Sequence, residues 1–206
     1  MSKQQSKTEE DILKSLDKPG AGVGVMQGLV MKFYIGPFVA AKTDWDADSR
    51  RFFASSKKIL TLIDGLDEKE VSQKVLVPPQ RGLEDSSRYW SAAMVLEHLM
   101  IVGMGLRDII IRLSQGKVPS GKVDTARVKP LGQTTAGIVV QNYKTFTETV
   151  ADQIAAGVKD RDSKAVYAHP WFGDFTTRQW HWLLATHNDI HLQQLQAIVA
   201  GLGRKI

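Results

Sequence analysis

Residues 176–202 read TTRQWHWLLATHNDIHLQQLQAIVAGL, and this stretch decides the fold. Its apolar residues recur every three or four positions, the spacing that places side chains on one face of an α-helix. Two histidines belong to the same stripe, which consists of Trp180, Leu184, His187, His191, Leu195, Ile198 and Leu202. The stretch therefore predicts one long amphipathic helix with two histidines directed into the core.

These two histidines are candidate metal ligands. His187 and His191 lie one helical turn apart, at about 5–6 Å between Cβ atoms, so both rings can reach one ion. Burying an imidazole without a hydrogen-bond partner costs about 1–3 kcal/mol, so two polar residues on a core stripe require a reason. The alternative is that each ring is half-buried and bonded to a carboxylate or carbonyl group. A third ligand elsewhere in the chain would favour the metal.

A second predicted helix, residues 91–113, supplies that third residue. Ser91 is a suitable N-cap because its hydroxyl can accept a hydrogen bond from a first-turn amide. The core stripe predicted for this helix is Met94, His98, Ile101, Gly105, Ile109 and either Arg112 or Leu113. His98 again replaces an aliphatic residue on the inward face. Three neutral imidazoles leave coordination positions open, which is typical of catalytic rather than structural metal sites.

Two further helices complete the predicted fold. Residues 48–66 and residues 134–158 show helical periodicity, and the second of these carries Ile138, Asn142, Phe146, Val150 and Ile154 along one face. Asn142 could line a site or merely lie at the edge of that face. We find no convincing strands. Four helices of about twenty residues predict an all-α four-helix bundle with one or two longer crossovers.

The N-terminal part is predicted to be an extension. Residues 1–24 are expected to form a flexible arm, and residues 25–206 the single helical bundle domain. Residues 26–41 predict a short helix that breaks at Gly36-Pro37 and packs on the outside of the bundle. We expect the apolar run 23–41 to be buried structure rather than a membrane span, because Lys32 and Pro37 interrupt it.

Composition narrows the chemistry. The 206-residue chain contains no cysteine, which excludes disulfides, thiolate zinc sites and cysteine nucleophiles, and favours a cytoplasmic location. Histidine and carboxylate groups remain as metal ligands. The formal net charge is +5, but the basic residues are dispersed, and only residues 49–58 form a basic and aromatic cluster. We interpret that cluster as a solvated helix start and expect neither a nucleic-acid nor a membrane partner.

Other motifs do not compete with the histidines. The glycines at positions 20, 22, 24 and 28 lack the preceding strand of a dinucleotide-binding fingerprint. Residues 116–123, GKVPSGKV, depart from a phosphate-binding loop because Val123 stands where a hydroxyl is required. His169 and His181 are expected to be structural or exposed. Glu97 and Asp189 are close in sequence to the predicted ligands, but the helical rotation turns them away, so neither is expected to orient an imidazole.

The arrangement resembles the DinB/YfiT-like superfamily of metal-binding helical bundles. The matching residues are Trp90-Ser91 leading to Glu97-His98-Leu99, then His169-Pro170-Trp171-Phe172-Gly173 with Trp180, and finally His187-Asn188-Asp189-Ile190-His191. The H-P-x-F-G segment is similar to one branch of the superfamily. The resemblance covers residues 48–202. Met94 departs from the common pattern because an acidic residue there would complete a capping box with Ser91.

This resemblance implies a divalent ion held by His98, His187 and His191, often in a homodimer that acts on a small-molecule substrate. Characterised relatives include thiol-dependent S-transferases and a maleylpyruvate isomerase that uses low-molecular-weight thiols, so such a thiol is a candidate cofactor. Imidazole ligation suits several ions; zinc or nickel is expected first, with iron as an alternative.

Three functional hypotheses follow, in order of support. The first is a metal-dependent enzyme, S-transferase-like or hydrolase-like, in which the ion activates a thiol or water toward a small electrophile. The second is a non-catalytic binding or stress-response module with a structural or vestigial metal site. The third, nucleic-acid binding through the basic surface, requires steep salt dependence.

Overall fold

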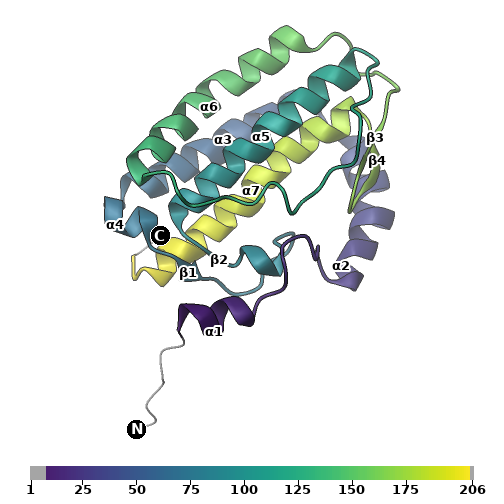
Figure 1. The fold of residues 1–206 in the computed structure, drawn as a ribbon. Helices are drawn as coiled ribbons and strands as arrows, with labels where there is room; N and C mark the ends of the chain where they lie inside the picture. The colour runs from purple at the N-terminus through teal and green to yellow at the C-terminus, as the bar shows by residue number, and fades with distance from the viewer. Residues whose placement is uncertain (1–7, 205–206) are drawn as a thin grey trace.

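Four long helices form a bundle (Figure 1). The structure is a computed structural model that describes residues 8–204. The helices are α3 (Trp45–Asp64), α5 (Ala92–Ser114), α6 (Ala136–Gly157) and α7 (Thr177–Gly201). Their existence and order confirm the predicted four-helix bundle. The largest difference in bounds is at α3, which begins three residues early because the Asp44 side chain caps it by accepting from the Ala47 amide at 2.7 Å.

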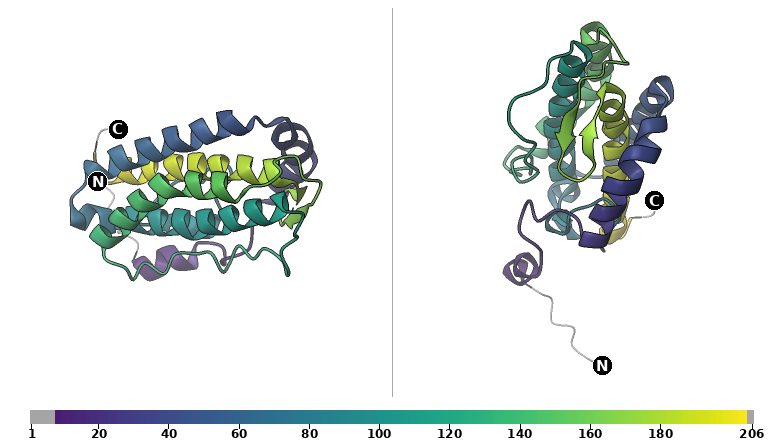
Figure 2. Two further views of the ribbon diagram at one scale, coloured as in Figure 1. Left: turned by 90° about the horizontal axis from the view of Figure 1, so that it is seen from above. Right: turned by 90° about the vertical axis from the view of Figure 1, so that its right-hand side faces the viewer.

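The connections fix the direction of each helix. α7 packs against α3 and α5, while α6 packs against α5 and α3 (Figures 1 and 2). α5 and α6 run in the same direction, because residues 115–135 return along the bundle before α6 begins (Figure 1). Their C-terminal ends therefore meet, and the Gln115 side chain donates to the Gly157 carbonyl at 3.3 Å. Residues 115–135 are the predicted longer crossover.

Both histidine-bearing helices begin directly after a short β-hairpin. β1 (Val75–Leu76) pairs antiparallel with β2 (Tyr89–Trp90), which leads into α5. β3 (Tyr167–His169) pairs antiparallel with β4 (Gly173–Phe175), which leads into α7. The expectation of no strands was therefore wrong, because pairs of two or three residues are too short to leave a periodic pattern.

Side-chain caps set the start of these two helices. The Ser91 hydroxyl accepts from the Met94 amide at 3.2 Å, as predicted. At the start of α7 a capping box joins Thr176 and Gln179, whose carboxamide oxygen accepts from the Thr176 amide at 2.9 Å. The hairpins and caps together fix where each histidine lies along its helix.

The remaining elements lie outside the bundle: α1 (Glu9–Lys14), α2 (Val25–Val30), the π-helix η1 (Met31–Val39), the 3₁₀ turns η2 (Ala40–Lys42) and η3 (Asp85–Ser87), and α4 (Glu68–Ser72). α1 starts with a capping box at Thr8, and Glu9 forms a 2.8 Å ion pair with Lys74. Residues 1–7 of the expected flexible arm lie outside the described residues. The flexibility of the arm stays a prediction.

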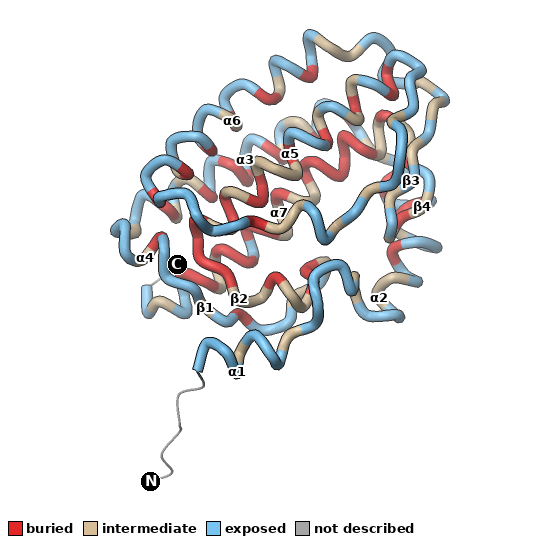
Figure 3. The backbone as a smooth tube through the Cα atoms, in the orientation of Figure 1, coloured by how far each residue is buried: buried red, intermediate tan, exposed pale blue. Residues whose placement is uncertain are grey.

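The segment 25–42 differs from expectation in two ways. The helix does not break at Gly36-Pro37; it continues with the wider turns of a π-helix, which accommodate the proline. It packs on the outside of the bundle, as predicted, but much of it is not buried (Figure 3). Eight large apolar side chains are between 41% and 83% exposed: Val25, Met26, Leu29, Val30, Phe33, Tyr34, Phe38 and Val39. Across residues 8–204 we find no helix with the length and apolar character needed to cross a membrane.

The core confirms one predicted stripe and corrects another. On α7, Trp180, Leu184, His191, Leu195 and Ile198 are buried as predicted, and the other two members of the stripe, His187 and Leu202, are half-buried. On α6, Val150 and Ile154 are buried as predicted, but in the first two turns the inward stripe lies one position further along: Ile138 and Asn142 are exposed, whereas Val139 and Tyr143 are buried. One residue turns a helix by about 100°, so this error placed the wrong side of the first two turns inward. Asn142 therefore lines no site.

His181 joins the start of α3 to the start of α7. Its ring stacks on Trp45 with centroids 3.7 Å apart, and its Nε2 lies 3.3 Å from the Ser49 hydroxyl. The side chain is 5% exposed, which agrees with the structural role expected for it. Burial, assisted by the charge of Arg161 and opposed by that of Asp46, lowers the pKa of His181 to about 4.

This buried histidine predicts acid sensitivity. The folded-state pKa lies below the ordinary 6.5, so between these values the unfolded chain binds a proton that the folded chain excludes. Stability is therefore lost as the pH falls from about 6.5 to about 4. We expect His181→Phe, which retains an aromatic ring against Trp45, to lose about 2 kcal/mol less unfolding free energy than the wild type between pH 7 and pH 4.5. Urea unfolding at both pH values measures this difference, and equal losses in the two proteins would contradict it.

A close approach at Gly36 predicts a steric effect. A Cβ added there would lie 2.7 Å from the Phe172 carbonyl oxygen, a backbone atom that cannot move alone, whereas a Cβ at Gly28 would meet only a Val23 methyl group at 4.0 Å. We expect Gly36→Ala to destabilise the protein by about 1–3 kcal/mol. Gly28→Ala, in the adjoining helix, should be neutral or stabilising by up to about 1 kcal/mol. Urea titrations of both variants test the contrast, which fails if the two midpoints shift alike.

Candidate metal centre

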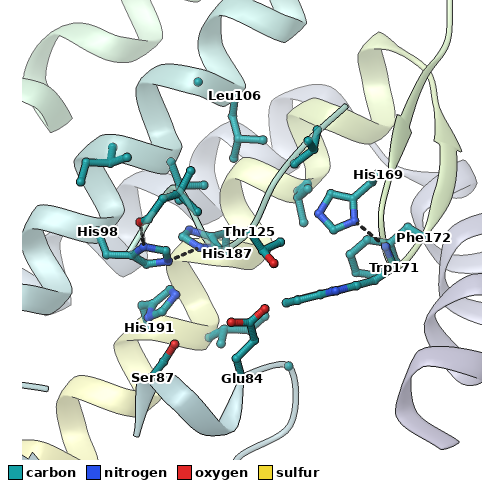
Figure 4. Close-up of a pocket in the computed structure, with 18 of the residues that line it drawn as sticks. Glu84, Ser87, His98, Leu106, Thr125, His169, Trp171, Phe172, His187 and His191 are labelled. Atoms are coloured by element: carbon teal, nitrogen blue, oxygen red, sulfur yellow. Dashed lines mark hydrogen bonds between the residues drawn. The ribbon is translucent and has the colours of Figure 1, made fainter. Parts of the chain in front are cut away.

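The three predicted ligands meet between α5 and α7 (Figure 4). His98 comes from α5, and His187 and His191 come from consecutive turns of α7. Each offers one ring nitrogen, and these nitrogens all lie within 4.8 Å of one another. The ring centroids are separated by 5.0 Å, 4.7 Å and 4.4 Å. The structure thus brings together residues that lie 89 positions apart in sequence.

A backbone carbonyl orients the first ring. His98 Nδ1 lies 2.7 Å from the carbonyl oxygen of Val128 in the crossover. A carbonyl can only accept, so Nδ1 carries the proton, and a neutral ring then has its lone pair on Nε2. That Nε2 lies 3.2 Å from His187 Nε2 (Figure 4).

A glutamine orients another ring. His191 Nδ1 lies 2.7 Å from Gln194 Oε1, and Gln194 Nε2 donates to the Ser87 carbonyl at 2.7 Å. The Ser87 carbonyl requires the amide nitrogen on its side, so the amide oxygen faces His191 and accepts from Nδ1–H. Gln194 is fully buried. Metal-binding histidines usually donate their second ring N–H to such an acceptor.

The spacing of the nitrogens fits a small divalent ion. Two nitrogens bound tetrahedrally at about 2.0–2.1 Å from a metal lie about 3.3–3.4 Å apart. The observed 3.2 Å between His98 Nε2 and His187 Nε2 is close to that value. Two lone pairs facing each other at this distance would repel, so the pair requires either a cation or a proton on His187 Nε2. The donor set therefore fits an imidazole-bound metal, and an N–H···N hydrogen bond is its metal-free alternative.

Burial keeps the three rings neutral. It lowers the pKa of His98 to about 4, with the charge of Lys129 acting in the same direction and the bond to Val128 acting against it. Burial also lowers the pKa values of His187 and His191 well below the ordinary range, and repulsion between the three rings adds to the effect. Neutral imidazole is the form that binds metals.

A cavity of about 190 Å³ adjoins the three histidines. The stripe that the sequence predicted as the packed core of α5 lines this cavity: His98, Ile101, Gly105 and Ile109. The face that packs in the core instead carries Leu96, Leu99 and Ile110. The centre of α5 is apolar on more than one side because it contacts α6, α7 and the cavity, so periodicity alone could not separate these faces.

The cavity wall also holds an ion pair between a buried carboxylate and a half-buried lysine, which could not be recognised from the sequence. Lys129 pairs with Glu84 and donates to the Ser87 hydroxyl at 2.7 Å. Glu84 is 5% exposed. Both residues lie on connections between helices, where no periodic pattern signals burial. Gln194 could have been found, because a residue three positions after His191 lies on the same helical face.

The other acidic and histidine residues lie where their sequence positions suggested, with one exception. Glu97 accepts from the Leu131 and Gly132 amides, and Asp189 forms a 3.0 Å ion pair with Arg51, so both are engaged elsewhere. His169 is the exception. It is neither a ligand nor simply structural, because it lines the same cavity as the three histidines (Figure 4).

Comparisons with known proteins add the following. No protein-family model matches the chain, and no curated protein matches it significantly. Among solved structures, the chain is similar to the crystal structure of TT2238, a four-helix bundle protein, at 24% sequence identity and a TM-score of 0.49. The match covers 75% of this chain and 99% of that one. A similarity of this size says nothing about a site or an activity.

Proposed function

We propose that the protein is a metal-dependent enzyme of the DinB/YfiT-like superfamily. His98, His187 and His191 would hold a divalent ion, zinc or nickel before iron, that activates a thiol or water toward a small electrophilic substrate. The reaction would be S-transferase-like or hydrolase-like. The observation that supports this most directly is the convergence of three neutral imidazoles beside a cavity, with two of their Nδ1–H groups already donated to fixed acceptors.

The ligand number favours catalysis over a purely structural metal. Structural zinc sites are closed by four protein ligands, whereas three ligands leave a position for substrate. An ion held here would supply Lewis-acid character and would shift the ionisation of water or a thiol toward neutral pH. Val128 and Gln194 hold two of the rings in position, and Ile101 and Ile109 contribute apolar side chains to the cavity wall.

The residues that carry the family resemblance support the same proposal. Trp90 packs edge-on against His98 at 5.1 Å between centroids, and the segment 169–173 forms the turn between β3 and β4 at the cavity. Segments distant in sequence thus meet around one site. A low-molecular-weight thiol cofactor, a homodimer and a cytoplasmic location belong to this proposal through the resemblance and the composition.

Elemental analysis tests the metal. We expect protein purified without a metal-affinity tag, or reloaded with Zn²⁺ or Ni²⁺ after chelation, to hold one ion per chain. His187→Phe should lose that ion, because two imidazoles remain. His181→Phe is the matched control on the same helix and should retain it, since His181 contacts Trp45 and not the cluster. A wild type that binds no ion, or a His187→Phe protein that binds as much as the wild type, would show the proposal to be wrong.

The glutamine should affect metal affinity without providing a ligand. Gln194→Leu removes the acceptor of the His191 Nδ1–H group, so we expect Zn²⁺ affinity, measured by competition with a chromogenic chelator, to fall about 10- to 100-fold. Gln193→Leu makes the same change at the adjacent exposed position and should leave affinity unchanged. Equal affinities in the two variants would remove Gln194 from the site.

A further inference from the structure

We propose that His169 is a substrate-binding residue whose Nε2–H donates a hydrogen bond to a carbonyl-type oxygen of a compact, neutral and otherwise apolar ligand in the cavity. This names a substrate class for the proposed enzyme and rests on that proposed function for its catalytic meaning. The binding itself requires no metal, so it can be tested separately.

The backbone determines which nitrogen of His169 carries the proton. The Trp171 amide donates to His169 Nδ1 at 3.1 Å, and an amide N–H can only donate. Nδ1 is therefore unprotonated. Burial lowers the pKa of His169 to about 3, so the ring is neutral at pH 7 and its single proton is on Nε2.

The Nε2–H group faces the cavity and lacks a protein acceptor. In Figure 4 one ring nitrogen of His169 bonds to Trp171 and the other points into the pocket, on the side where His187 lies. Within residues 8–204 no side chain or carbonyl accepts from it. The ring is held by Phe172 at 4.9 Å and Trp180 at 5.5 Å between centroids. A fixed, partly desolvated donor of this kind gains most from a ligand that brings its own acceptor.

The volume and lining of the cavity indicate the size, polarity and charge of the rest of the ligand. A volume of about 190 Å³ is slightly larger than the 150 Å³ apolar cavity known to bind benzene, so one ring with a small substituent fits. Val102, Leu106 and Phe172 supply apolar walls. The charged side chains in the wall, Glu84 and Lys129, neutralise each other, which favours a neutral ligand over an ion. A donor aimed at a carbonyl oxygen would also polarise an electrophile.

Two isosteric probes separate this hydrogen bond from apolar binding. Acetophenone carries a carbonyl oxygen where α-methylstyrene carries a CH₂ group. Calorimetry or ligand-observed NMR should give both affinities for the wild type, as purified and after chelation. In His169→Phe we expect the ratio of acetophenone to α-methylstyrene affinity to fall about two- to tenfold, the value of one neutral hydrogen bond. His169→Gln, whose amide N–H can reach the Nε2 position, should restore much of the ratio. Both variants remove His169 Nδ1, the acceptor of the Trp171 amide, so this loss is common to them and their difference reports the restored donor.

The outcomes are distinct. An unchanged ratio in His169→Phe, an equal fall in His169→Gln, or no binding of either probe to the wild type overturns the inference. If the variants fail to fold, ¹⁵N NMR of the wild-type imidazole decides: its Nε2–H signal must shift with acetophenone and not with α-methylstyrene. If the ratio of acetophenone to α-methylstyrene affinity depends on His169 but the protein binds no ion, the metal enzyme is refuted and the His169 subsite is retained. If the protein binds an ion but the ratio does not depend on His169, the subsite is refuted and the metal enzyme is retained.

Discussion

Three imidazole rings in mutual contact, two of them buried and His187 half-buried, constrain everything around them. Protonation of any one would place a positive charge beside two polar rings in an apolar environment, so burial holds all three neutral. A neutral ring has one N–H and one lone pair. The Nδ1–H groups of His98 and His191 donate to the Val128 carbonyl and to Gln194. The lone pairs of these two rings are therefore on Nε2, within the cluster of three histidines. These lone pairs require either a cation between them or a proton on His187 Nε2.

The bundle places the three histidines at one level and supplies the groups that orient them. The two hairpins and the caps at Ser91 and Thr176 fix the longitudinal positions of α5 and α7, so that His98 comes to the level of His187 and His191. The crossover between two parallel helices then passes over the gap and contributes a carbonyl and a lysine. Opposite the three histidines, the β3–β4 turn holds His169 in the other tautomer. The cavity thus has lone pairs on one side and an N–H donor on the other.

The sequence contained most of the fold and the three proposed ligands because long helices repeat their pattern many times. On α7 the stripe from Trp180 to Leu202, which includes His187 and His191, keeps to one face over about six turns. The features that could not be predicted depend on individual contacts and leave no repeated pattern in the sequence. The first two turns of the stripe on α6 were displaced by one position, since they carry apolar residues at both Ile138 and Val139. Periodicity also could not show that one apolar face of α5 lines a cavity.

The residues that surround and orient the three histidines also could not be predicted from the sequence, with one exception. Val128 acts through its backbone carbonyl, and Glu84 and Lys129 lie on irregular connections, so none has a sequence signature. His169 precedes a proline at the end of β3, and its sequence position gave no indication that its tautomer would be fixed by the amide two residues later. Gln194 alone followed a rule, the i, i+3 spacing from His191. For residues 25–39 the sequence prediction was wrong: their apolar composition suggested burial, but the structure leaves many of them exposed.

The central claim is that the Nε2 atoms of three histidines share one ion. Crystals grown with Zn²⁺ and measured at the zinc absorption edge test it most directly. We expect one strong anomalous peak about 2.0–2.1 Å from Nε2 of His98, His187 and His191, with the Nδ1 bonds to Val128 and Gln194 intact. The absence of a peak between these rings, or coordination through Nδ1 with those bonds broken, would contradict it.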